Sequence, residues 1–131
     1  MRNLGVNLDG LWIPIYGAPL SGERLSSKLV AQACLRAAET AGNMAVILRR
    51  GDPDSGALFV KALARDRQAR LFGQTIDYDG SAAWRSLTGG APAQETDIDA
   101  RLAREAKIDP DIWVIEVLDD ALEHPLRPKL V

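Results

Sequence analysis

The sequence predicts a small single domain of the α+β class, with a mainly antiparallel sheet and two helices packed on one face of that sheet. Two segments carry apolar residues at helical spacing, near residues 25–41 and 96–108. Short apolar runs separated by turn residues fill the sequence between and after them. At 131 residues and 47% hydrophobic content, the chain can bury one core. The predicted order is α-β-β-β-(β)-α-β.

The chain divides into an N-terminal arm (1–23), a core domain (24–119) and a C-terminal tail (120–131). The arm carries an apolar run that Pro14 interrupts, which is typical of an edge strand or an extended arm. An apolar arm must be covered by its own core or by another subunit. We therefore expect an interface on the arm, made by Trp12, Ile13, Ile15 and Tyr16. The tail carries two prolines and is expected to lie extended on the surface.

The first helix is predicted over residues 25–41. Apolar residues recur at every fourth position from Leu25 to Ala37. Gly42 is suited to the position after the helix, and Ser21 or Ser26 could cap its start.

Two apolar runs follow, Met44–Leu48 and Ala57–Leu63. The first is continuous, which suits a well-buried strand. The second alternates, with Lys61 on the same side as Phe59. Because residues 51–56 are rich in Asp, Pro, Ser and Gly, the two strands are predicted to form an antiparallel hairpin.

Two further strands are predicted at residues 69–72, extending towards residue 76, and at residues 84–87. The second helix opens at Thr96, where Asp99 approximates a capping box, and ends before Pro110. A last strand is predicted over residues 112–118.

From Lys28 to about Asp119 the chain resembles a family of small bacterial proteins known only as a domain of unknown function. The residues that carry this resemblance are Ala41-Gly42, Val46-Ile47-Leu48-Arg49-Arg50-Gly51-Asp52, Ser55-Gly56-Ala57, Lys61, Arg70-Leu71-Phe72-Gly73, Trp84, Leu87-Thr88-Gly89 and Ile108-Asp109-Pro110-Asp111-Ile112-Trp113-Val114-Ile115-Glu116. The resemblance implies a compact α+β domain without established activity or catalytic residues. The arm and the tail fall outside it.

Composition excludes several classes of protein. The net charge of −2 gives no global argument for binding nucleic acid or membrane, and neither is expected as a partner. A single cysteine, Cys34, excludes an internal disulfide, and with His124 as the one histidine no metal site is expected. His124 is expected on the surface and Cys34 in the core. This cysteine usage suits the cytoplasm, and no cofactor is expected.

The candidate ligand site is the loop at residues 49–56, with Arg50, Asp52, Asp54 and Lys61 as its residues. Two acids in a glycine turn could share a hard cation, but Asx turns explain the same residues. A nuclease would pair an acid two residues before Lys61, where Phe59 stands instead.

The sequence therefore predicts a non-enzymatic module that binds an unidentified protein or a second copy of itself. The alternative is a phosphate-ligand or nucleic-acid binding protein, or an enzyme, whose polar site is that loop.

Overall fold

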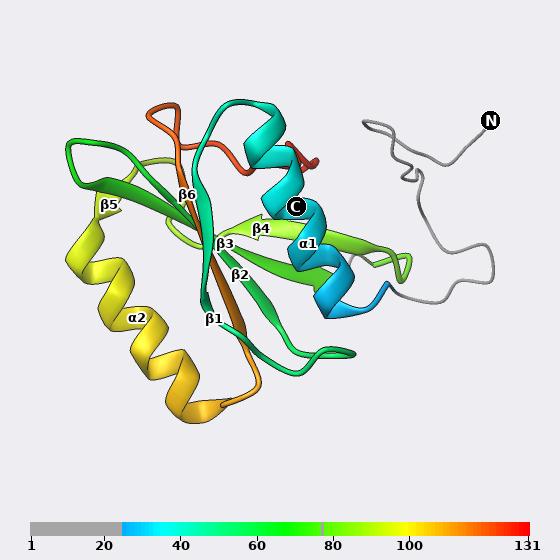
Figure 1. The fold of residues 1–131 in the computed structure, drawn as a ribbon. Helices are drawn as coiled ribbons and strands as arrows, with labels where there is room; N and C mark the ends of the chain where they lie inside the picture. Colours follow the sequence, from blue (N-terminus) through cyan, green and yellow to red (C-terminus); the bar gives the residue numbers. More distant parts are fainter. Residues whose placement is uncertain (1–24, 77) are drawn as a thin grey trace.

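The computed structural model describes residues 25–76 and 78–131, and Figure 1 shows their fold. The predicted interface residues Trp12, Ile13, Ile15 and Tyr16 lie outside the described residues. The elements are α1 (Ser27–Thr40), β1 (Ala45–Arg49), β2 (Leu58–Leu63), β3 (Gln68–Ile76), β4 (Ala82–Ser86), β5 (Ala93–Gln94), α2 (Glu95–Ile108) and β6 (Trp113–Leu118). The predicted α+β class is confirmed, and so is the order of elements apart from the two-residue β5, which was not predicted.

Helix α1 is shorter than the predicted 25–41, and its buried residues are Ser27, Ala31, Cys34 and Ala38. Leu25 and Leu29 of the predicted apolar stripe are exposed, so that part of the prediction is wrong, whereas the predicted ends are capped as follows. The Ser26 side chain accepts a hydrogen bond from the backbone N–H of Leu29 at 3.2 Å, which satisfies one of the free amides of the first turn. Gly42 follows the helix with φ +83°, a left-handed conformation that glycine adopts without strain.

The strands form one sheet with the order β1-β6-β2-β3-β4, and β5 pairs with β3. All neighbours are antiparallel except β2 and β6, which run parallel with Leu58 opposite Trp113. Strand β6 suits a central place because it buries apolar residues on both faces, Ile115 and Val117 on one and Val114 on the other.

The predicted hairpin of β1 and β2 is wrong, because β6 lies between them. The chain entering β6 passes against the loop at residues 51–56. Asp52 donates its N–H to the Asp111 carbonyl at 3.0 Å, and Trp113 donates its N–H to the Ala57 carbonyl at 2.8 Å. A Cβ on Gly51 or Gly56 would overlap the Asp111 carbonyl oxygen. The loop glycines therefore make room for a strand that comes from 60 residues further along the chain.

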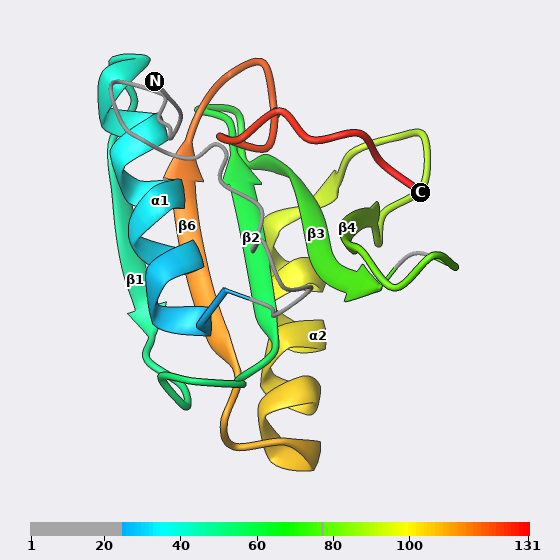
Figure 2. The ribbon, with the colours of Figure 1, turned by 90° about the vertical axis from the view of Figure 1, so that its right-hand side faces the viewer.

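The two helices cover opposite faces of the sheet, whereas we predicted both on one face (Figure 2). Alternation along β2 and β6 gives each face its own apolar residues, so each helix covers one set. On one face α1 packs against a cluster of Ala31, Cys34, Ala38, Leu58, Val60, Ala62, Phe72, Trp84, Trp113, Ile115 and Val117. On the other face α2 packs in a cluster of Leu63, Ala69, Leu71, Ile98, Leu102, Ile112 and Val114.

Strand β1 is an edge strand and is not well buried, contrary to the prediction. Ala45 and Ile47 pack against the α1 core, but Val46 and Leu48 point to the opposite face and are exposed. The continuous apolar run therefore predicted the strand correctly, but the prediction that both of its faces are buried is wrong.

The capping box predicted for α2 is also absent. The helix begins one residue earlier than expected, at Glu95, after Gln94, whose side chain makes no capping hydrogen bond. Asp99 instead reaches across to Lys61 on β2.

The C-terminal tail packs back on the α1 side of the sheet. Its Leu122 contacts the α1 core, and Val131 donates its N–H to the Trp84 carbonyl at 2.9 Å. His124 is 3% exposed, so the prediction of a surface histidine is wrong. No helix among residues 25–76 and 78–131 is long and apolar enough to cross a membrane.

Candidate functional site

The loop at residues 51–56, where the sequence places a ligand site, is occupied by local hydrogen bonds. One carboxylate oxygen of Asp52 accepts the N–H groups of Asp54 and Ser55 at 3.1 and 2.9 Å and the Ser55 hydroxyl at 3.2 Å. The backbone N–H of Ser55 is the main cause that holds the pKa of Asp52 below its ordinary value. This is the Asx turn that the sequence left as an alternative to a cation site.

The same loop closes the N-terminal end of α1. The carbonyls of Asp54 and Pro53 accept the N–H groups of Ser27 and Lys28 at 3.1 and 2.9 Å, and the Ser27 hydroxyl donates to the Gly56 carbonyl at 2.6 Å. Because first-turn amides have no partner inside a helix, the loop supplies acceptors that α1 needs. The loop thus ties α1 to the sheet.

Lys61 does not converge with the other three predicted ligand residues. The guanidinium of Arg50 stacks over the Trp113 ring, 5.4 Å from its centroid, and the side chain of Asp54 is exposed. Lys61 lies on the opposite face of the sheet from Leu58 and Val60, in contact with α2. The structure therefore separates Lys61 from the loop.

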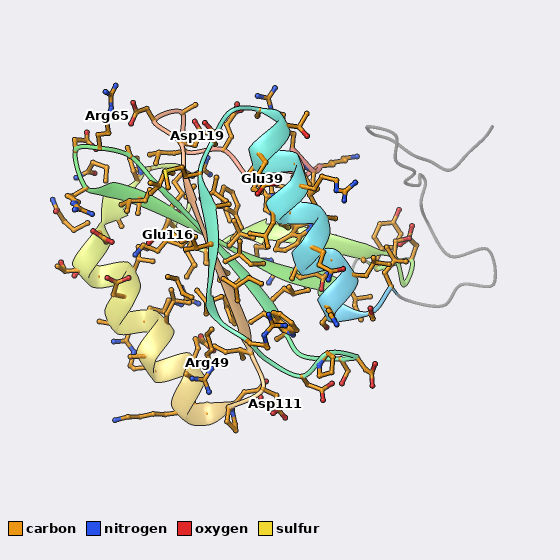
Figure 3. The ribbon with its side chains drawn as sticks, in the orientation of Figure 1. Glu39, Arg49, Arg65, Asp111, Glu116 and Asp119 are labelled. Carbon is orange, nitrogen blue, oxygen red and sulfur yellow. The ribbon has the colours of Figure 1, made fainter. Side chains whose placement is uncertain are left out.

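Lys61 instead forms the centre of a charged cluster, which we call the Lys61 cluster and define as Lys61, Glu95, Asp99 and Glu116. The Lys61 ammonium lies 2.7 Å from oxygens of Glu95 and Asp99, both on α2, and 3.1 Å from an oxygen of Glu116 on β6. Figure 3 shows Glu116 on the side of the sheet that faces α2. The lysine side chain is 2% exposed, so its three N–H groups each meet a carboxylate in a nearly dry site.

The electrostatics of the Lys61 cluster keep the lysine charged. Burial acts to lower its pKa, but the hydrogen bonds of Asp99, Glu95 and Glu116 outweigh that effect and raise the pKa above its ordinary value. Lys61 in turn is the main cause of the lowered pKa of Glu95. A nucleophilic lysine needs the opposite shift, so this ammonium suits a fixed link between α2 and the sheet.

The sequence analysis missed the Lys61 cluster, although a signal for it was present. Glu95 and Asp99 are four residues apart, which places them on one face of a helix. Lys61 and Glu116 each stand at an inward position among apolar strand residues. Charged residues at such positions need partners of opposite charge. Within the described part of the chain, no group of three His, Cys, Asp or Glu residues is placed to hold a metal ion.

An apolar surface remains open beside this cluster. We call it the β1 strip and define it as Met44, Val46, Leu48 and Leu118. These residues are 69%, 45%, 51% and 42% exposed, respectively. Strand pairing sets Val46 opposite Glu116, and Leu118 donates its N–H to the Met44 carbonyl, so the strip lies on the α2 side. The apolar cluster under α2 contains no residue of β1, so the helix leaves this end of the face uncovered.

The fold and these surfaces define a small α+β domain with one helix on each face of its sheet. It has a buried lysine bound by three carboxylates and an apolar strip at one edge of the sheet. Residues 25–127 match the family described as "Protein of unknown function (DUF1491)", and the chain belongs to that family. The match runs past Asp119 to Arg127, so most of the tail is included, contrary to expectation.

Solved structures agree with this assignment. A crystal structure of a DUF1491 family protein from Caulobacter crescentus CB15 has a TM-score of 0.72 and 38% identity, covering 82% of this chain and 100% of that one. An NMR structure of a DUF1491 family protein from the same organism has a TM-score of 0.70 and 38% identity, with 82% and 96% covered. The solution structure of protein Atu0922 from A. tumefaciens has a TM-score of 0.69 and 27% identity, covering 83% and 96%. No protein with a curated description matches the chain significantly.

Proposed function

We propose that this chain is a protein-binding module, that its partner docks on the β1 strip, and that the partner is a second copy of the chain. The observation that carries the proposal is the strip itself, four exposed apolar side chains side by side on one sheet face. Contiguous apolar surface of this kind is typical of interaction sites.

The edge of β1 supports a second copy as the partner. Among the described residues β1 has a strand on one side only, so the amides of its other edge are available for pairing. Antiparallel pairing about a two-fold axis at Val46 sets Met44 opposite Leu48 of the copy, and Val46 opposite itself. All these contacts are apolar and self-complementary, as a two-fold interface requires.

The register shift between Ile47 and Arg49 leaves Leu48 without a partner on β6, at the end of the proposed pairing. Arg49 pairs with Val114 and lies on the α2 side, as the strip does, and its guanidinium donates to the Pro110 carbonyl at 2.8 Å. Figure 3 shows Arg49 near the end of α2. The hydrogen bond to Pro110 holds the charge of Arg49 at the end of α2.

Light scattering of the full chain over a range of concentrations tests this proposal. We expect a mass of twice 14.2 kDa, which Val46→Lys reduces to the monomer value because two lysines would meet on the axis. Leu29→Lys is the matched control, since Leu29 is 49% exposed on α1 and outside the strip. A dimer that survives Val46→Lys, or a monomer at every concentration, contradicts the proposed partner.

The alternative of a ligand site at the 49–56 loop stays a prediction. The geometry gives it less support, because Asp52 is used within the turn and Lys61 lies in a separate cluster.

A further inference from the structure

Helix α1 lies close to the open edge of β1, where the second copy is proposed to pair. It contacts both β1 and β6, and Figure 2 shows it in front of these two strands and along them. Neighbouring strands are about 4.8 Å apart. A two-fold axis beside β1 therefore brings the two α1 helices to an axis separation of about two strand spacings, or ~10 Å. Helices that pack against each other have axes about 8–10 Å apart.

One flank of α1 faces past the edge of β1. The side that is buried on the sheet is formed by Ser27, Ala31, Cys34 and Ala38. The residue after each of these lies about 100° further round the helix. Because α1 is right-handed and runs upward in front of the sheet in Figure 2, that turn leads to the left, past β1. We call this surface the α1 flank and define it as Lys28, Gln32, Leu35 and Glu39.

The proposed two-fold axis crosses α1 at the middle of this flank. Asn43 donates its N–H to the Ala38 carbonyl at 2.9 Å, so the chain that leads into β1 is level with the end of the helix at Thr40. Val46, at the axis, is three residues further along, or about 10 Å of strand. At about 1.5 Å per residue, the same distance back along α1 covers about six to seven residues. The axis is therefore level with Ala33 and Cys34.

An axis at this level makes the α1 flank complementary to itself. Lys28 and Glu39 lie equally far from a point between Ala33 and Cys34, on opposite sides of it, so Lys28 meets Glu39 of the copy. By the same symmetry Gln32 meets Leu35, which is half-buried. Both Lys28 and Glu39 are exposed, and neither forms an ion pair within residues 25–76 and 78–131. Opposite charges are thus available to pair across the axis.

We propose that the α1 flank is a second contact surface of the dimer, on which α1 packs antiparallel to α1 of the copy and Lys28 of each subunit pairs with Glu39 of the other. The inference rests on the proposed pairing of β1. Specific interfaces bury about 1,200–2,000 Å² in total. Strand β1 is five residues long, so its edge is about 17 Å long and about 10 Å thick. The α1 flank supplies contact area that strand pairing alone lacks.

Carbodiimide coupling of the full chain, followed by mass spectrometry of the digested product, tests this contact. The reagent forms an amide between an amine and a carboxylate that touch. Within one chain Lys28 and Glu39 are about 16 Å apart along the helix, so an amide between them must join two subunits. We expect this amide in the covalent dimer. A dimer in light scattering without the amide overturns the α1 contact and leaves the β1 pairing standing, whereas a monomer at every concentration overturns both.

Charge reversals on the α1 flank give a second test, measured by analytical ultracentrifugation. Lys28→Glu places like charges opposite each other twice in each dimer and should raise the dissociation constant of the dimer about tenfold. The double variant Lys28→Glu/Glu39→Lys exchanges the two charges and should restore the wild-type value. Arg36→Glu is the matched control, because Arg36 is exposed on the side of α1 that faces away from the sheet, and it should change nothing. Equal weakening by Lys28→Glu and Arg36→Glu, or no recovery in the double variant, contradicts the proposal.

Discussion

Lys61 and His124 are two buried polar side chains that accommodate burial in opposite ways. Lys61 keeps its charge because three carboxylates surround its ammonium. His124 has no carboxylate bonded to its ring and stays neutral, with burial holding its pKa at about 3. Each solution makes a different prediction for stability.

The neutral state of His124 predicts a loss of stability in mild acid. The ordinary pKa of the ring is 6.5 in the unfolded chain and about 3 in the folded one. As the pH falls below 6.5, the unfolded state therefore binds a proton that the folded state rejects. The free energy of unfolding should fall by about 1.4 kcal/mol per pH unit at most. Denaturant unfolding at pH values from 7 to 5 measures it.

His124→Phe is the control for this prediction, because it keeps an aromatic ring against Trp84. His124 is the single histidine of the sequence, and ordinary carboxyl groups titrate below about pH 5. The variant should therefore show nearly constant stability between pH 7 and 5. A wild-type protein with constant stability over that interval would contradict a buried neutral ring.

The Lys61 cluster predicts that Lys61→Met destabilises the fold although methionine fits a buried position. The change leaves three carboxylates facing one another around an apolar side chain. Removing one partner from a buried ion pair costs about 3–5 kcal/mol, and exposure of Asp99 places the expected loss near 3 kcal/mol at pH 7. Chemical denaturation measures the change.

Arg67→Gln is the matched control. Arg67 lies 3.1 Å from Glu95, but its side chain is 69% exposed, so solvent screens the pair. We expect a loss below about 1 kcal/mol. Equal losses for the two variants would show that burial of the Lys61 cluster adds nothing.

At the scale of elements, the loop at residues 51–56 holds β1, β6 and α1 together. Gly51→Ala or Gly56→Ala should destabilise the protein by at least ~2 kcal/mol, since a Cβ would overlap the Asp111 carbonyl and force the backbone apart. Thermal unfolding measures the loss. Gly90→Ala, where a Cβ meets open space, should change stability by less than about 0.5 kcal/mol. If Gly51→Ala and Gly56→Ala unfold like the wild type, the loop does not pack as described.

The helices and strands could be predicted from the sequence, but which strands lie next to each other in the sheet could not. Local signals such as the Ser26 cap, Gly42 and the alternation of β2 depend on nearby residues, and they were interpreted correctly. The insertion of β6 between β1 and β2 depends on contacts some 60 residues apart, and periodicity carries no such information. The same lack of information on strand pairing explains why Lys61 was assigned to the loop at residues 49–56. Without the pairing of β6, Lys61 appeared to belong with Asp52, whereas its partners come from α2 and β6.

At the scale of the whole molecule, the tail is part of the packed structure. Leu122 contacts the α1 core, and His124 covers Phe72 and Trp84. Its prolines suggested an extended surface segment because composition does not show what a segment covers. The family match to Arg127 is consistent with its packing.

A chain that ends at Asp120 should therefore be much less stable than one that ends at Arg127. The shorter chain loses the burial of Leu122 and His124, which we expect to cost about 4 kcal/mol and to lower the melting temperature by more than about 10 °C. The chain ending at Arg127 loses only the bridge of Leu130 to Trp84 and should melt within a few degrees of the full chain. Hydrogen exchange of the Trp84 indole N–H gives a local measurement, because Trp84 is 5% exposed in the intact fold. Slow exchange in the chain ending at Asp120 would mean that the tail does not protect this side of the sheet.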